Sequence, residues 1–518
     1  MPRGGFGQLS AAALGGALAA LGLPSLGLWV FAWCGLVPLI VAANAATTVR
    51  RSALYGFIAG FAYHVVALHW IYATCRFAQV PAVVSTLAVL ALAAVLGASW
   101  AAVAVLASCS AAAFGRAARP WLWALCWTAV ASAASLWTPR FGVDLLGYTQ
   151  WNNLSLIQAG SWGGPHLLDF VIMLFNATLA EAWLDACDRA VPRRSAPSTL
   201  RSLGAAMALS AGIWAHGVSV LASRPEARGP SGRVEILQPR VDQYHKWDES
   251  WIAEILAGYD ELLSRPRSSA PLLVVWPETA IPRWSRRDEP VPEAARWAVK
   301  LGAPHLVGII AGADRDGGPA NAVQLIAPDG HLDGGYSKRQ LVPFGEFVPL
   351  RRLVPRFVVD RWLTILDNLG DLEAGAARQP LLLTAWGPTA VTICYEAIFP
   401  RWPRLDAARG ARLMINITND AWYLDTWGPR QHYRVNRFRA IENRLSVIRA
   451  GNNGVSAVID PWGVTTAELA LNERGRLDAE VPLADAFPSR SFYVRHGDWL
   501  GAVCLVLVLI ALLRRPFI

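Results

Sequence analysis

Long apolar runs separated by short arginine clusters dominate the first 222 residues and return near the C-terminal end. A helix that crosses a membrane needs about 20 mainly apolar residues. The pattern therefore predicts about seven N-terminal membrane helices, the first short and rich in glycine and alanine, and one C-terminal helix. The predicted spans are 9–23, 26–46, 52–73, 80–110, 121–138, 164–186, 199–222 and 498–513.

Between residues 223 and 497 short strand-like runs alternate with runs of helical apolar spacing. Strands are predicted at 232–239, 271–278, 305–312, 321–330, 380–386, 389–394, 411–419, 446–452 and 454–463, and helices at 250–263, 293–302 and 432–445. This order predicts one α/β domain with buried strands. The predicted organisation is a membrane domain (1–222), a catalytic domain (223–497) and a C-terminal helix with its tail (498–518).

Composition and charge agree with a membrane protein. Hydrophobic residues make up 54% of the chain, and 24 residues are tryptophan, which is too apolar for a soluble protein of this length. If the N-terminus is cytoplasmic, the arginine clusters fall on the cytoplasmic ends of the spans, and seven crossings place residues 223–497 outside. The clustered residues are Arg3, Arg50, Arg51, Arg116, Arg119, Arg189, Arg193, Arg194, Arg201, Arg514 and Arg515. No basic-aromatic RNA motif or helix-turn-helix pattern supports a nucleic-acid partner.

Few ionisable groups lie inside the predicted spans: His64, His69, Asp169 and Glu181. Intramembrane polar groups are functional candidates, but no chain of acidic residues suggests a proton-coupled transporter. We therefore expect helix-helix hydrogen bonds or interfacial positions. The semi-polar stretch 139–160 is expected at the outer interface, against the large domain.

Cys394 ends the β-branched run of TAVTICYEAIFP, residues 389–400. The other six cysteines lie in or beside apolar segments, so Cys394 has no predicted disulfide partner. The pattern predicts a buried strand that ends at a sharp turn and presents a thiol. Such a thiol is either an inert core residue or a nucleophile.

Two further stretches favour the nucleophile. Glu278 follows the apolar run of PLLVVWPET, and GGYSKRQLVPFGEFVP supplies Lys338 and Glu346. Acyl transfer by a thiol needs a carboxylate that takes its proton and a cation that holds the oxyanion. We therefore expect these groups to meet at the ends of consecutive buried strands.

The motifs WPET, YSKRQLVPFGEFVP, ICYE and NITNDAWY resemble the nitrilase superfamily. That resemblance implies an αββα sandwich with a Glu-Lys-Cys triad: Glu278 as general base, Lys338 as oxyanion stabiliser and Cys394 as nucleophile. Glu346 matches a second acidic position. Tyr395 and Glu396 match the residues after the nucleophile, and Trp247 matches an active-site tryptophan, although a packed interfacial aromatic is an alternative. The departures, at Tyr423 and Asn452–Asn453, do not touch the triad.

With its membrane spans, the chain is similar to one branch of that superfamily, the apolipoprotein N-acyltransferases. The resemblance implies a multi-pass inner-membrane enzyme whose α/β domain faces the periplasm. The implied reaction transfers an acyl chain from a phospholipid to the α-amine of the diacylglyceryl-cysteine of a lipoprotein, through a cysteine thioester. No cofactor is implied. No HExxH or paired CxxC motif indicates a metal site.

The stretch 347–366 is apolar with interspersed arginines and suits an interfacial lid, with a core helix as the alternative. Two other functions stay open at this point. A membrane-anchored amidase would use the same triad on a soluble substrate. A transporter with a degenerate accessory domain would not need the triad at all.

Overall fold

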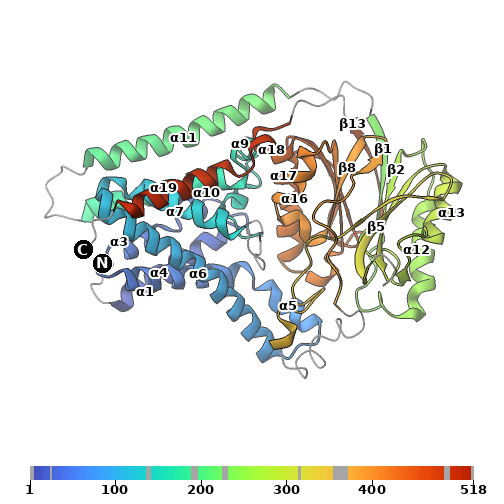
Figure 1. Cartoon of the computed structure of the whole chain (residues 1–518), viewed down its shortest axis with the longest axis horizontal. Coiled ribbons are helices and arrows are strands. Elements are labelled where there is room, and N and C mark those ends of the chain that lie inside the picture. Colours follow the sequence, from blue (N-terminus) through green and yellow to red (C-terminus); the bar gives the residue numbers. More distant parts are fainter. Residues whose placement is uncertain are drawn as a thin grey trace. The chain divides into compact units, whose positions relative to one another are not determined.

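The computed structural model describes residues 5–23, 26–135, 142–187, 196–224, 231–312, 317–353, 371–482 and 490–514 of the 518-residue chain. The chain forms two compact units (Figure 1). The first unit contains Met1–Tyr72, Ala82–Ser223 and Ser491–Ile518, and the second contains Ala73–Pro81 and Arg224–Arg490. Relative to the predicted domains, residues 73–81 join the second unit and residues 491–497 the first.

Helices build the first unit because its apolar runs satisfy their backbone hydrogen bonds internally. They are α1 (Gly5–Leu21), α2 (Phe31–Cys34), α3 (Val37–Asn44), α4 (Val49–Ala67), α5 (Trp70–Phe77, which continues into the second unit), α6 (Ala82–Phe114), α7 (Arg119–Ala134), α8 (Leu154–Ile157), α9 (Gly160–Gly163), α10 (Pro165–Cys187), α11 (Ala196–Ala222), α18 (Phe492–His496) and α19 (Trp499–Leu513). By length and composition, α6, α10 and residues 198–222 of α11 each suffice to cross a membrane. Helices α4 and α5, bent by 54° at their break, would make a fourth span if counted as one. The number of membrane helices therefore stays a prediction.

The predicted span 26–46 is not one continuous helix, because α2 and α3 are separated at Gly35 and Leu36. Pro38 lies in the first turn of α3 and lacks a backbone donor. Asn176 of α10 provides the missing partners: its Oδ1 accepts from Leu36 N at 3.0 Å, and its Nδ2 donates to Ala32 O at 2.7 Å. A side chain of a neighbouring helix therefore forms hydrogen bonds with the backbone groups at the break.

The ionisable groups of the predicted spans are paired, as expected for helix-helix hydrogen bonds. Asp169 Oδ1 accepts from Gly147 N at 2.7 Å. Glu181 accepts from Asn44 and from Arg116. His64 Nε2 lies 2.9 Å from Asp144 Oδ2, whereas His69 is exposed.

The stretch 139–160 is described from residue 142 and contains η2 (Leu146–Gln150), which is buried in the first unit. Its predicted position against the large domain stays a prediction.

Two sheets build the second unit. The seven-stranded sheet has the order β13 (Gly475–Pro482), β1 (Ser231–Gln238), β2 (Leu273–Val275), β4 (His305–Ala311), β5 (Ala320–Ile326) and β6 (Leu332–Ser337), and β3 (Trp284–Ser285) pairs with β4. The six-stranded sheet has the order β12 (Thr465–Leu469), β11 (Ser456–Ile459), β10 (Ser446–Gly451), β9 (Leu413–Thr418), β8 (Gly387–Ile393) and β7 (Leu382–Thr384).

Helices cover the outer faces of both sheets. Figure 1 shows α12 (Ile252–Ser264) and α13 (Pro292–Leu301) on one side and α16 (Arg401–Ala408) and α17 (Gly428–Asn443) on the other. One core lies between α12, α13 and the first sheet, and another between α17 and the second sheet. The unit is therefore the predicted αββα sandwich, and every predicted strand and helix of the α/β domain overlaps an observed one.

Four strands (β3, β6, β12 and β13) and helix α16 were not predicted. Most of the predicted lid, residues 354–366, lies outside the described residues.

Candidate active site

Three strand ends carry the predicted triad. Glu278 lies three residues after β2, Lys338 directly follows β6, and Cys394 directly follows β8. The expectation of consecutive buried strands is wrong. Strands β2 and β6 are separated by β4 and β5 in one sheet, while β8 belongs to the other sheet, and β6 is only partly buried. Stacking of the two sheets, and not succession along the chain, brings the groups together.

Lys338 lies between two carboxylates. Its Nζ is 2.8 Å from Glu346 Oε1 and 3.4 Å from Glu278 Oε1. The Asn321 side chain on β5 donates to the same two oxygens, at 2.9 and 2.7 Å. Burial would lower the pKa of Lys338, but the charges of Glu346 and Glu278 outweigh burial and raise it. Lys338 is therefore a permanent cation held by two anions.

The Glu278 side chain is fixed at its second oxygen as well. Oε2 accepts from the backbone N of Asn419 at 2.8 Å. Gly308 on β4 runs so close to this segment that an added Cβ would lie 2.4 Å from Pro277 O and 2.8 Å from Glu278 Cα. Glycine at this position therefore makes room for the main chain that carries Glu278.

Cys394 is buried and has a positive φ of 50°, which is rare for a residue with a side chain. Burial raises the pKa of the Cys394 thiol, the Glu278 charge adds to this rise, and the Lys338 charge opposes it. The thiol is therefore protonated at rest. The charges of Glu278 and Lys338 therefore both act on the Cys394 thiol.

Glu396 ties the Lys338 segment to the Cys394 turn. Its carboxylate accepts from the backbone N of Ile393 at 2.8 Å and of Gln340 at 3.0 Å, from Arg339 N, and from Tyr336 Oη at 2.7 Å. Burial raises the pKa of Glu396, and the charge of Arg339 opposes that rise. Glu396 therefore joins the segment around Lys338 to the turn at Cys394.

A second buried network, which is charged, holds the backbone of Cys394. His432 on α17 has Nε2 2.9 Å from Cys394 O and Nδ1 2.9 Å from Asp420 Oδ1. Arg449 Nη2 donates to Asp420 Oδ2 at 2.7 Å. Burial would raise the pKa of Asp420, but Arg449 and His432 together lower it. The chain from Arg449 to the Cys394 carbonyl therefore braces the strained turn.

Two other predicted site residues lie at the periphery of this arrangement. The buried ring of Tyr395 packs edge-on against Phe399, with the centroids 5.0 Å apart. Trp247 is 36% exposed. In the same segment, Tyr244 packs against Phe77 of α5 at 4.4 Å between centroids. Segment 73–81 therefore contributes to the surface of the catalytic unit.

Sequence reasoning missed several residues that hold the site: Lys246, Asn321, Asn419, Asp420 and His432. Asn321, Asn419 and Asp420 lie in predicted strands or in the NITNDAWY motif. His432 begins a predicted helix, and Lys246 directly precedes Trp247. The adjacency of Lys246 to Trp247 was the available signal.

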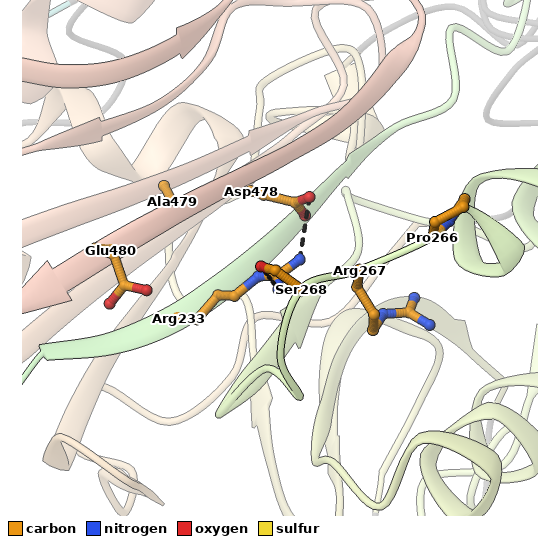
Figure 2. Close-up of a pocket in the computed structure, with 7 residues that line it drawn as sticks. All are labelled: Arg233, Pro266, Arg267, Ser268, Asp478, Ala479 and Glu480. Atoms are coloured by element: carbon orange, nitrogen blue, oxygen red, sulfur yellow. Dashed lines mark hydrogen bonds and ion pairs between the residues drawn. The ribbon is translucent and has the colours of Figure 1, made fainter.

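A separate hollow of about 410 Å³ lies at the opposite end of β1 and β2 from Glu278. Figure 2 shows Arg233 paired with Asp478 across it. Arg233 also pairs with Glu235 and donates to Ser268. The hollow contains none of the triad residues. Arg267 pairs with Glu235, and Glu480 accepts from Ser231 Oγ at 2.7 Å. It is lined by Arg233, Pro266, Arg267, Ser268, Asp478, Ala479 and Glu480.

A buried thiol with a carboxylate and an ammonium in an αββα sandwich defines a thiol-dependent enzyme of the carbon-nitrogen hydrolase class. Residues 241–490 match the carbon-nitrogen hydrolase family, and residues 15–178 match the apolipoprotein N-acyltransferase N-terminal domain. The chain belongs to the apolipoprotein N-acyltransferase family.

Two relatives support this placement, and one solved structure is given beside them for comparison only. The apolipoprotein N-acyltransferase of Geobacter metallireducens is 31% identical over 95% of this chain and 92% of its own. That of Sinorhizobium medicae is 31% identical over 96% and 94%. The solved structure of Saccharomyces cerevisiae Nit3, a member of branch 10 of the nitrilase superfamily, aligns with 51% of this chain and 95% of its own at 17% identity and a TM-score of 0.37.

Proposed function

We propose that this acyltransferase moves an acyl chain from a membrane phospholipid to the α-amine of the diacylglyceryl-cysteine of a lipoprotein, through a thioester on Cys394. The enclosure of Cys394 with Glu278 and Lys338 is the observation that carries the proposal. Family membership supports the lipoprotein acceptor. The membrane-length helices of the first unit support a donor that stays in a bilayer, because lifting an acyl chain into water costs about 0.8 kcal/mol per CH₂.

In the first half-reaction, Glu278 takes the Cys394 proton as the sulfur attacks the ester carbonyl. A carbon-sulfur bond forms, and the negative charge on the carbonyl oxygen faces the Lys338 ammonium. Collapse breaks the carbon-oxygen ester bond, and the departing lysophospholipid oxygen takes the proton from Glu278. Proton transfer must accompany attack because the buried thiol is protonated at rest.

In the second half-reaction, the lipoprotein α-amine attacks the thioester, and Glu278 accepts its proton. The carbon-sulfur bond breaks, an amide forms, and the proton returns to the Cys394 thiolate. Arginine asymmetry supports an inner-membrane location in which this chemistry takes place on the periplasmic side.

The decisive experiment omits the acceptor. Purified protein in detergent, incubated with phospholipid alone, should gain one acyl chain on Cys394 by intact and peptide mass spectrometry, and neutral hydroxylamine should release it. The Cys394→Ala variant should gain none, whereas Cys187→Ala, which removes an exposed cysteine of α10, should behave like the wild type.

A lipoprotein peptide with a free α-amine should discharge the thioester, and an amine-blocked peptide should not. Transfer to the peptide by Cys394→Ala would contradict covalent catalysis. Rapid loss of the acyl chain to water without any amine would favour the membrane-anchored amidase.

A further inference from the structure

Lysine is rare in this chain. Only three of its 47 basic residues are lysines: Lys246, Lys300 and Lys338. Lys300 is exposed on α13, where its Nζ lies 4.1 Å from the ring centroid of Trp297. Lys246 and Lys338 are each 1% exposed. The chain therefore encloses two of its three lysines in the catalytic unit, and the triad accounts for only one of them.

Lys246 contacts the segment that carries the general base. It lies between β1 and α12, and its Nζ donates to the backbone O of Glu278 at 3.1 Å. The same loop reaches Glu278 by a second route: Gln243 Oε1 accepts from Asn419 Nδ2 at 2.7 Å, and Asn419 N donates to Glu278 Oε2 at 2.8 Å. Lys246 therefore holds the main chain of Glu278 while Asn419 holds its side chain.

The charges of the site explain why this donor is a cation. Glu278 and Glu346 both face Lys338, so the triad and its second acid have two negative charges and one positive charge. An excess charge in a buried site is costly. Lys246 supplies the second positive charge, so that two lysines balance two glutamates around the neutral thiol.

A lysine suits this position better than an arginine because its charge is compact and its three donors rotate freely. Burial lowers the pKa of Lys246 to about 8, and the charges of Glu278 and Cys394 oppose that fall. Lys246 is therefore mainly protonated at neutral pH. Lys338 and Asp420 are the further charged groups that act on Cys394.

We propose that Lys246 is a positioning residue of the acyl-transfer site, which holds the Glu278 main chain and supplies a second buried positive charge that stabilises the negative charge developing on Cys394. The proposal rests on the proposed role of Cys394. It predicts that the reactivity of the thiol, and not only the stability of the fold, depends on the Lys246 charge.

Two substitutions separate the charge from the hydrogen bond. Lys246→Gln retains a donor for the Glu278 carbonyl but has no charge, and Lys246→Met has neither. Lys300→Met removes an exposed lysine and is the matched control. Carbamidomethylation of Cys394 by iodoacetamide, followed by peptide mass spectrometry, reports the reactivity of the thiol. At pH 7, where Lys246 is charged, both Lys246 variants should be alkylated about tenfold more slowly than the wild type, and Lys300→Met should match the wild type. The difference should disappear above about pH 9, where Lys246 is neutral in the wild type as well.

A wild-type alkylation rate at pH 7 in Lys246→Gln but not in Lys246→Met would overturn the electrostatic part of the proposal, and wild-type rates in both would overturn all of it. A purely structural role would lower the unfolding temperature without a rate difference that disappears above about pH 9. Acyl transfer by Cys394→Ala would show that the proposed function is wrong. The alkylation of Cys394 would still report on Lys246 in that case.

The wild-type protein offers a test that needs no folded Lys246 variant. Lysine labelled with ¹³C at Cε gives three NMR signals, and Lys300→Met identifies one of them. Because Lys338 stays charged, we expect the remaining signal that titrates near pH 8 to be Lys246, charged at pH 7. A Lys246 signal that is neutral at pH 7 would overturn the proposal.

Discussion

Gly308 shows how closely the position of the base depends on a single residue. In Gly308→Ala, the new Cβ would lie 2.4 Å from Pro277 O, so the Glu278 segment must move. Misplacing a catalytic group by about 1 Å costs roughly 10²-fold in rate. We expect the rate of Cys394 acylation by phospholipid to fall by about that factor, measured as the increase of the thioester by mass spectrometry.

Gly258→Ala is the matched control, because this helical glycine in α12 has only the end of the Arg474 side chain near its added Cβ, at 3.4 Å. Alanine favours a helix over glycine by about 1 kcal/mol, so this control should unfold at the same or a higher temperature and acylate normally. Wild-type acylation in Gly308→Ala would show that the Glu278 segment tolerates displacement.

At the same scale, the sequence singled out the three triad candidates but not the residues that hold them in place. Glu278, Lys338 and Cys394 stand in compact motifs whose residue types match three chemical roles. Asn419 and Asn321 act through contacts with residues far along the chain, such as the hydrogen bond from Asn419 N to Glu278 Oε2. No periodicity in the sequence records such contacts. Lys246 lies outside the predicted strands and helices, and its burial arises only from packing.

At the scale of elements, buried strands were predictable because continuous β-branched and aliphatic runs mark them. Strand β6 was not, because its sequence LDGGYS contains two glycines and an aspartate, which disfavour strands. It forms because it pairs antiparallel with β5. Ala322 lies opposite Ser337 at one end of this pairing, and Ile326 lies opposite Leu332 at the other. Tertiary pairing therefore overrides local propensity where the strand must deliver Lys338.

Asp420, in the loop after β9, contacts His432 of helix α17. Its ionisation makes the stability of the fold depend on pH. Because the folded protein lowers the pKa of Asp420 below its usual 3.8, its ionised form stabilises the fold above about pH 4. That contribution is lost as the pH falls through the lowered pKa. The Asp420–Arg449 ion pair should therefore matter at neutral pH and progressively less in acid.

Asp420→Asn leaves Arg449 without its buried carboxylate, so we expect a loss of about 3–5 kcal/mol of unfolding free energy at pH 7. Thermal unfolding in detergent from pH 7 down to pH 3 measures it, and the gap from the wild type should narrow below about pH 4. Asp288→Asn, at an exposed ion pair, should match the wild type throughout. A gap that does not change with pH would exclude ionisation of Asp420 as its cause.

The whole molecule needs a defined orientation, because the proposed acceptor is met on only one side of the membrane. The chain leaves the first unit at Ser223 and returns to it at Ser491. Helix α11 is long enough to cross a membrane, whereas α19 has 15 residues. At 1.5 Å per residue, α19 extends about 22 Å, which is less than the roughly 30 Å thickness of the hydrocarbon core of a bilayer. Like the broken span 26–46, the C-terminal crossing is therefore a weak step in the predicted topology.

Reporter fusions test that step. We expect alkaline phosphatase fused after residue 230 to be active and a cytoplasmic fluorescent reporter at the same site to be dark, because the arginine clusters favour the cytoplasmic side. Fusions after Arg515 should give the reverse result, since Arg514 and Arg515 flank α19 and a short helix is accommodated by local thinning of the bilayer. Equal activity of alkaline phosphatase at both sites would mean that α19 does not cross. Activity only of the fluorescent reporter after residue 230 would place the catalytic unit in the cytoplasm and contradict the periplasmic reaction.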